Sequence, residues 1–198
     1  VIGTDDMYEK IYWGSEPFTS LLTVVPELYD RTVTINGVSK AYAMTGWRIG
    51  YCGGPRELVS AMGTIQGQST SNAASMSQRA AVVALNGEQE CVAKMNQAFR
   101  ERHDYVVGAL NTLPGVSCLP ASGAFYAFAD VSKAMQNLGL KDDNAFADHL
   151  LTQAGVVVQY LRLSLWPSPL RGVYDWGVVR AFGQAVLIDC HSMPHEAI

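Results

Sequence analysis

The sequence of 198 residues lacks the features typical of membrane, secreted and nucleic-acid-binding proteins. Its longest apolar stretches, such as residues 155–158 and 185–188, are far shorter than the roughly 20 residues of a transmembrane helix. It has no basic block, since 14 Lys and Arg residues stand against 18 Asp and Glu residues, a formal net charge of −4. No charged segment followed by an apolar one opens the chain, as a secretory signal would. We therefore expect a soluble, cytoplasmic protein with no nucleic-acid and no membrane partner.

Cysteine is sparse and follows no pattern. Cys52, Cys91, Cys118 and Cys190 form no CxxC pair and no evident framework for disulfide bridges. This spacing indicates free thiols in a reducing compartment. Hydrophobic residues make up 48% of the chain, enough to build a core. A disordered tail and a disulfide-stapled mini-protein are therefore excluded.

Strand and helix patterns alternate through most of the sequence, which predicts an α/β fold. Apolar residues at helical spacing, Pro55 at a first helical turn and a Ser71 or Asn72 N-cap mark helices, while β-branched alternation marks strands. The predicted strands are residues 31–35, 48–52, 116–118, 125–128 and 185–189, and the predicted helices are residues 55–65, 72–85, 88–113 and 144–154. The change of pattern after residue 115 predicts a smaller α/β unit behind a larger one.

The segment with the most chemical content is residues 36–51, Asn-Gly-Val-Ser-Lys-Ala-Tyr-Ala-Met-Thr-Gly-Trp-Arg-Ile-Gly-Tyr. It places Lys40 among small and apolar residues at the end of a predicted strand. Such surroundings favour a nucleophilic amine that can form a Schiff base. A solvated loop lysine is the alternative interpretation of Lys40 taken alone.

The whole string resembles the cofactor-lysine signature of class I/II aminotransferases, the fold type I enzymes that use pyridoxal 5'-phosphate. The similarity runs from Val1 to about Leu165. The resemblance implies the later part of the large domain with its long connecting helix over residues 1–112, an incomplete small domain over residues 113–165, and a divergent tail over residues 166–198. It also implies a homodimer that moves an amino group between an amino acid and a 2-oxo acid.

The resemblance assigns roles to five residues of the first 50. Lys40 binds the cofactor covalently and moves the substrate proton, which makes it catalytic together with Tyr8. Arg48, expected on the strand after Lys40, grips the cofactor phosphate beside Ser39. Asp5 pairs with the pyridine nitrogen, and the Tyr8 phenol hydrogen-bonds the O3′ oxygen.

Two positions bear on how complete this site is. Many family members have Ser where this chain has Gly37, so one phosphate hydrogen bond is missing or comes from a backbone N–H. Arg162 resembles the arginine that clamps the substrate α-carboxylate. The loop that precedes this arginine in the family is missing between Val158 and Tyr160.

Family enzymes also have a first half with a phosphate-binding turn and an aromatic residue stacked on the cofactor. This chain opens on Val1 and not on Met, in a segment that is typical of the end of a buried strand. We therefore expect a fragment that binds pyridoxal phosphate weakly or not at all when isolated.

The last residues suggest a second relationship. Residues 182–195 resemble N-formylglutamate amidohydrolases, which are zinc enzymes. Asp189 and His191 lie two residues apart on a predicted strand and so face the same side, and the resemblance makes His191 a candidate zinc ligand. The alternatives to a transaminase are therefore a zinc-dependent amidohydrolase and a non-catalytic remnant of a composite reading frame.

Overall fold

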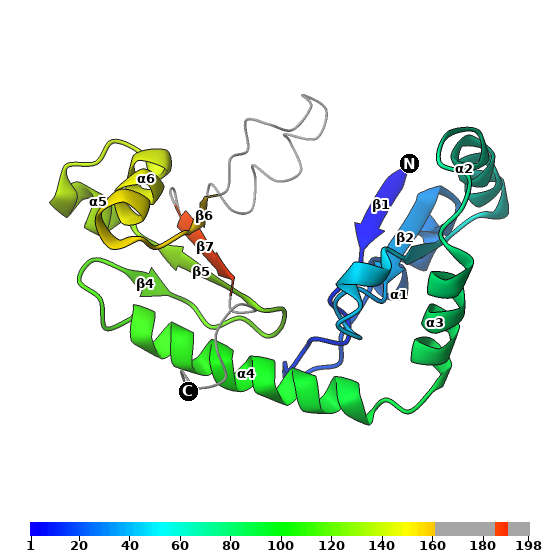
Figure 1. Cartoon of the computed structure of the whole chain (residues 1–198), viewed down its shortest axis with the longest axis horizontal. Coiled ribbons are helices and arrows are strands. Elements are labelled where there is room, and N and C mark those ends of the chain that lie inside the picture. Colours follow the sequence, from blue (N-terminus) through cyan, green and yellow to red (C-terminus); the bar gives the residue numbers. More distant parts are fainter. Residues whose placement is uncertain (161–184, 190–198) are drawn as a thin grey trace. The chain divides into compact units, whose positions relative to one another are not determined.

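The computed structural model describes residues 1–160 and 185–189. The chain divides into two compact units (Figure 1). Unit 1 comprises residues 1–97 and 122–124, and unit 2 comprises residues 98–121 and 125–198. Each unit combines a sheet with helices, which confirms the predicted α/β class. The domain boundaries expected after residues 112 and 165 stay predictions.

Unit 1 contains a three-stranded mixed sheet with β2 (Thr32–Gly37) in the middle. β1 (Ile2–Asp5) runs parallel to β2, and β3 (Gly50–Gly53) runs antiparallel to it. The expected strand at residues 31–35 is confirmed, whereas the one expected at 48–52 begins two residues later. The opening segment does form a strand, but its residues are half-buried or exposed, so the expectation of a buried strand was wrong.

Unit 1 contains the helices expected after Pro55, and before them short helices that were not predicted. They are α1 (Leu21–Val24), a 3₁₀ helix (Pro26–Arg31), α2 (Arg56–Ser69), α3 (Ser75–Asn86) and the first turns of α4 (Glu90–Leu110). Pro55 immediately precedes α2, as its fixed backbone angle favours. The predicted Ser71 or Asn72 cap of α3 was wrong, because Ala74 is the N-cap and Ser71 adopts a left-handed conformation (φ 64°) that turns the chain between the helices.

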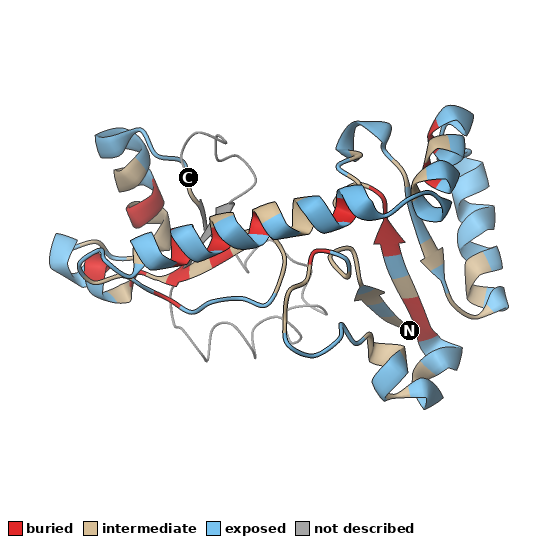
Figure 2. Cartoon of the chain, turned by 90° about the horizontal axis from the view of Figure 1, so that it is seen from below, coloured by how far each residue is buried: buried red, intermediate tan, exposed pale blue. Residues whose placement is uncertain are grey.

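Helix α4 contributes to the cores of both units. Val92, Phe99 and Val106 are spaced seven residues apart and are 7%, 4% and 8% exposed, so they form one buried stripe (Figure 2). Met95 and Leu110, predicted on the same stripe, are half-buried. Val92 belongs to unit 1, and Phe99 and Val106 belong to unit 2.

Unit 2 has a four-stranded antiparallel sheet in the order β4 (Ser117–Cys118), β5 (Tyr126–Asp130), β7 (Ala185–Asp189) and β6 (Gln159–Tyr160). Along β5 and the residue before it, Phe125, Ala127 and Ala129 alternate as buried residues. The Phe125 ring packs against Phe99 with centroids 5.2 Å apart. The predicted strand at 185–189 is confirmed.

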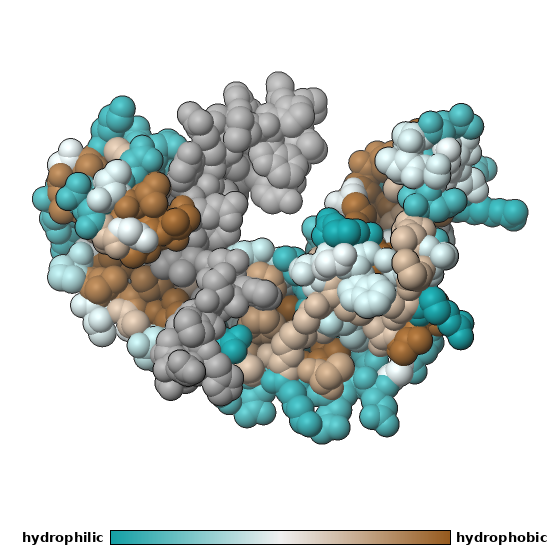
Figure 3. Space-filling view, viewed as in Figure 1, coloured by the Kyte–Doolittle hydropathy of each residue, from teal (hydrophilic) through white to brown (hydrophobic). Residues whose placement is uncertain are grey.

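Besides its part of α4, unit 2 contains the helices α5 (Ser132–Leu138) and α6 (Asp143–Ala154). The sequence predicted α6, whose N-cap Asp142 accepts a hydrogen bond from Ala145 N, but did not predict the short α5. Both helices end at a left-handed glycine, at φ 67° and 66°. Apolar surface lies beside α6 (Figure 3), where a cavity of about 270 Å³ is lined entirely by apolar side chains, including Phe146, Leu150 and Val156.

Cys52, Cys91 and Cys118 are free thiols, as the spacing predicted, and Cys190 lies outside the described residues. Among the helices in the described part of the chain, none is both long and apolar enough to span a bilayer.

Candidate active site

The topology of unit 1 brings the predicted site segments to one edge of its sheet. β1 and β2 are parallel, so both end at the same edge, with Asp5 opposite Ile35. β3 is antiparallel, so it begins at that edge, with Gly50 opposite Gly37. The turn after β1, the turn after β2 and the turn before β3 therefore meet there. In α/β sheets, ligands bind beyond the carboxyl ends of the strands.

Lys40 lies in the turn between β2 and β3, called the lysine turn here (residues 38–48). Two fully buried residues anchor it, Val38 at 0% and Ala41 at 3% exposure. Backbone bonds close it, from Tyr42 N to Val38 O (3.3 Å) and from Ala43 N to Lys40 O (3.2 Å). Ser39 and Lys40 are half-buried between these anchors. The turn thus holds a hydroxyl and an amine at the edge of the sheet.

Gly37 is tightly enclosed at the end of β2. A Cβ added there would lie 3.1 Å from Met7 Cε, 3.2 Å from Gly50 Cα and 3.3 Å from Ile49 O. Its N–H donates to Asn36 Oδ1 at 2.7 Å. Close approach of the backbones explains the glycine, and the Gly37 N–H is already engaged within the protein.

Arg48 does not lie on the strand after Lys40, so that prediction was wrong. A 3₁₀ helix (Thr45–Trp47) precedes it, and Arg48 is left-handed (φ 51°, ψ 50°), which turns the chain into β3 two residues later. Its Nη1 donates to Thr45 O at 2.8 Å, and the side chain is exposed. Ala43 is also left-handed (φ 52°), and such a conformation costs a non-glycine residue about 1 kcal/mol.

The end of β1 and the segment after it are rich in carboxylates. Asp5 is exposed, and its Oδ1 accepts a hydrogen bond from Met7 N at 3.1 Å. Burial, together with the nearby carboxylates of Glu9 and Asp5, raises the pKa of Asp6. Tyr8 is half-buried, and its carbonyl oxygen accepts from Ile11 N at 2.9 Å. Hydrogen bonds from backbone N–H groups to the Asp5 side chain and to the Tyr8 carbonyl oxygen thus stabilise the turn after β1.

Sequence reasoning missed two phenols, that of Tyr42 in the lysine turn and that of Tyr51 on β3. Tyr42 donates to Gln89 Oε1 at 2.8 Å. Burial, then the Glu9 carboxylate and the Cys91 thiol, raise the pKa of Tyr42, although the Gln89 hydrogen bond opposes them. Burial, then Glu9 and Tyr42, likewise raise the pKa of Tyr51. No short sequence motif marks this group, because Gln89 lies 47 residues from Tyr42.

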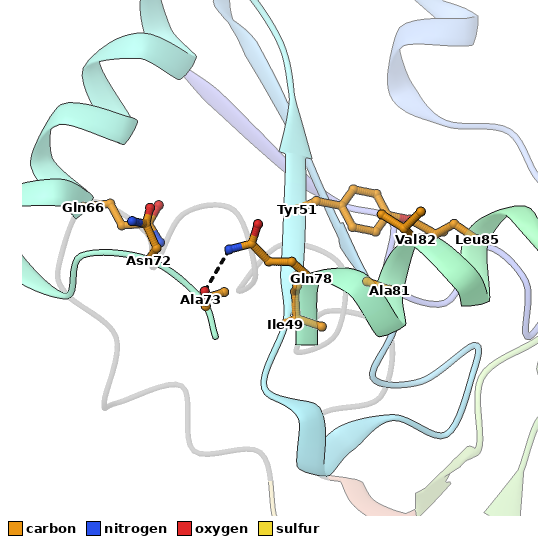
Figure 4. A pocket seen from close by; sticks show the side chains of 10 residues that line it. Ile49, Tyr51, Gln66, Asn72, Ala73, Gln78, Ala81, Val82 and Leu85 are labelled. Carbon is orange, nitrogen blue, oxygen red and sulfur yellow. Dashed lines mark hydrogen bonds between the residues drawn. The ribbon is translucent and has the colours of Figure 1, made fainter. Parts of the chain in front are cut away.

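A separate pocket of about 390 Å³ opens between β3, α2 and α3 (Figure 4). Three carboxamides line it, from Gln66, Asn72 and Gln78, with apolar side chains beside them. The Gln78 amide donates to Ala73 O at 2.8 Å. None of the five predicted site residues among the first 50 lines this pocket.

Two predicted site residues, Arg162 and His191, lie outside the described residues. Within the described ranges, no group of three or more His, Cys, Asp or Glu side chains could hold a metal ion.

Comparison with known proteins establishes the family. The fold is that of the aspartate aminotransferases, which are fold type I transferases. The family model of class I and II aminotransferases matches residues 2–172, and the chain belongs to this family. The match extends seven residues past Leu165, where we expected the similarity to stop.

The individual relatives and solved structures are also aminotransferases. An aspartate/prephenate aminotransferase from Nitrosomonas europaea is 51% identical over 183 residues, which are 85% of this chain and 46% of the relative. The aspartate aminotransferase structure from Rhizobium meliloti superposes with a TM-score of 0.80 at 39% identity, covering 98% of this chain and 46% of that one. The Thermus thermophilus aspartate aminotransferase with maleate gives a TM-score of 0.72 at 32% identity, over 95% and 43% of the two chains. The chain thus spans a little under half the length of these relatives.

Proposed function

We propose that the protein is an aspartate-using aminotransferase, which transfers an amino group between an amino acid and a 2-oxo acid with pyridoxal phosphate as cofactor. One observation carries the proposal: the lysine turn, which ends at Arg48, and the Asp5 segment meet at one edge of a sheet, in a chain of the aminotransferase family. Aspartate is the proposed amino donor because the relatives are named for it. The maleate in the Thermus structure is likewise a dicarboxylate.

The residues present fit the chemistry of this cofactor. Arg48 is exposed and donates one N–H to Thr45, so the remaining N–H groups of its five-donor fork suit a phosphate. Ser39 supplies a hydroxyl from the preceding turn. Asp5, exposed at the end of β1, supplies a carboxylate for a protonated pyridine nitrogen. Bound there, pyridoxal phosphate supplies an electron sink for the substrate Cα.

Each residue of this site has its own role in the proposed reaction. The Lys40 Nζ serves as nucleophile and afterwards holds and moves the substrate proton. The Tyr8 phenol would donate a hydrogen bond to the O3′ oxygen of the cofactor. The anchors Val38 and Ala41 keep the amine at the sheet edge, so little orientation remains to be fixed when the cofactor binds. Arg162 remains the proposed clamp for the substrate carboxylate. We also propose a cytoplasmic homodimer.

Reductive trapping tests the assignment of Lys40. The chain is incubated with pyridoxal phosphate, reduced with borohydride and mapped by mass spectrometry over its five lysines. We expect several-fold more label on Lys40 than on the exposed Lys10 of the same unit. Lys40→Ala should lose this label, whereas Lys10→Ala, the matched control, should keep it. Equal labelling of Lys40 and Lys10 would contradict the proposal.

A chimera tests the reaction. The matched region of the Nitrosomonas relative is replaced by this chain, since the two are 51% identical. We expect transfer from aspartate to a 2-oxo acid, and none with Lys40→Ala. A folded, inactive chimera would favour the non-catalytic remnant. Zinc bound after dialysis of the 198-residue chain, and lost in His191→Ala, would favour the amidohydrolase alternative.

A further inference from the structure

His103 is a buried imidazole with both ring nitrogens engaged. It lies on α4 in unit 2 and is 1% exposed. Its Nε2 accepts a hydrogen bond from the backbone N–H of Ala121, 18 residues away, at 2.9 Å. Its Nδ1 lies 3.1 Å from Asp104 Oδ1, and the Asp104 side chain is 64% exposed. The Ala121 N–H can only donate, so Nε2 must be the unprotonated nitrogen that accepts this bond. The proton of the neutral ring is therefore on Nδ1.

Protonation is incompatible with this arrangement. An imidazolium has two N–H donors and no acceptor, so a second proton on Nε2 would oppose the Ala121 N–H. The hydrogen bond to Ala121 therefore exists only while His103 is neutral.

The segment that His103 holds, residues 119–124, is hydrogen-bonded to the backbone of residues 11–13. Ser122 O, one residue after Ala121, accepts from Trp13 N at 2.8 Å, and Ala124 N donates to Ile11 O at 2.8 Å. The fit at Gly123 is tight, since an added Cβ would lie 2.6 Å from Ile11 O.

Residues 11–13 are in turn tied to the candidate site. Ile11 N donates to Tyr8 O at 2.9 Å. Asn96, from the first half of α4, donates from Nδ2 to Tyr12 O at 2.8 Å. A continuous series of backbone contacts thus leads from Ala121 to the turn that carries Tyr8.

We propose that His103 is a positioning residue: as the acceptor of the hydrogen bond from the Ala121 N–H, it fastens residues 119–124 and through them the backbone behind Tyr8. Asp104, on the same helix, is an ionisable residue beside the ring. Residues 119–124 carry no ionisable side chain, and Tyr8, Glu9, Lys10 and Tyr12 lie further along the held backbone. The importance of Tyr8 for the reaction rests on the proposed function.

Amide hydrogen exchange of the 198-residue chain, measured at one pH, tests the proposal. Loss of one neutral hydrogen bond should speed exchange about fivefold. We expect this increase at the Ala121 and Trp13 amides in His103→Leu, which has no acceptor. His103→Gln keeps an acceptor, so its exchange should stay close to that of the wild type. His149→Gln, on α6, is the matched control and should behave as wild type.

Nitrogen-15 spectra of the wild-type imidazole give a second measurement that does not depend on the variants folding. They should show a proton on Nδ1 and an unprotonated Nε2 at pH 8. The opposite tautomer, wild-type exchange rates in His103→Leu, equally fast exchange in His103→Gln and His103→Leu, or a response confined to Ala121 would each overturn the proposal. Trapping at Lys40 does not involve His103, so failure of the proposed function would be seen separately.

Discussion

Replacing Gly37 by alanine tests how closely the strand ends approach beside the lysine turn. The added Cβ would meet Met7 Cε at 3.1 Å and two backbone atoms at 3.2 and 3.3 Å. The Met7 end can move, but the backbone of Ile49 and Gly50 cannot yield without disturbing the pairing of β2 and β3. Overpacking of this kind costs about 1–3 kcal/mol. We expect Gly37→Ala to lower the free energy of unfolding by that amount.

Urea denaturation followed by tryptophan fluorescence measures the effect. With a slope of about 2 kcal/mol/M, the midpoint should fall by about 0.5–1.5 M. Gly53→Ala is the matched control on β3, because a Cβ there meets nothing within 4 Å. Adding Met7→Ala to Gly37→Ala should recover only part of the loss, since two of the three contacts are with backbone. A midpoint equal to that of Gly53→Ala, or full recovery in the double variant, would refute the reasoning.

Two further predictions concern the unit 2 core and the phenol of Tyr42. Phe125→Ala should lower the free energy of unfolding by about 3–5 kcal/mol in calorimetry, because the ring is 2% exposed, whereas Leu119→Ala, at 69% exposure, should change it by less than about 0.5 kcal/mol. The raised pKa of Tyr42 means that the folded state holds the phenol proton more tightly than the unfolded state, whose value is near 10.0. The contribution of Tyr42 to the free energy of unfolding is therefore fully present below pH 10 and is lost as the pH rises above it. Tyr42→Phe should flatten this loss in denaturation curves measured between pH 9 and 11. An unchanged dependence of the free energy of unfolding on pH would contradict the assignment.

Periodicity predicted those elements whose burial is regular. The α4 stripe of Val92, Phe99 and Val106 is visible in the sequence because one face of the helix is consistently apolar. Periodicity did not reveal α5, which has seven residues, too few for a repeating pattern. It also implied burial for α2, although Met62 and Ile65 are 44% and 69% exposed.

The candidate site was predictable where adjacent residues act together and not where the chain folds back. The string around Lys40 marks the lysine turn because its residues are contiguous. The place of Arg48 was not predictable, because a left-handed residue leaves no reliable signal in a non-glycine sequence. The Tyr42–Gln89 bond and the Ala121–His103 bond join residues 47 and 18 positions apart, and only the folded chain shows them.

The buried stripe of α4 has a consequence for how the molecule unfolds. Because residues of this single helix complete the cores of both units, neither core can lose the helix without exposing apolar side chains in its own half. A helix is cooperative along its length, so fraying that starts at Val92 can propagate toward Phe99. The 21 residues of α4 are therefore the element through which damage in one unit would lower the melting temperature of the other.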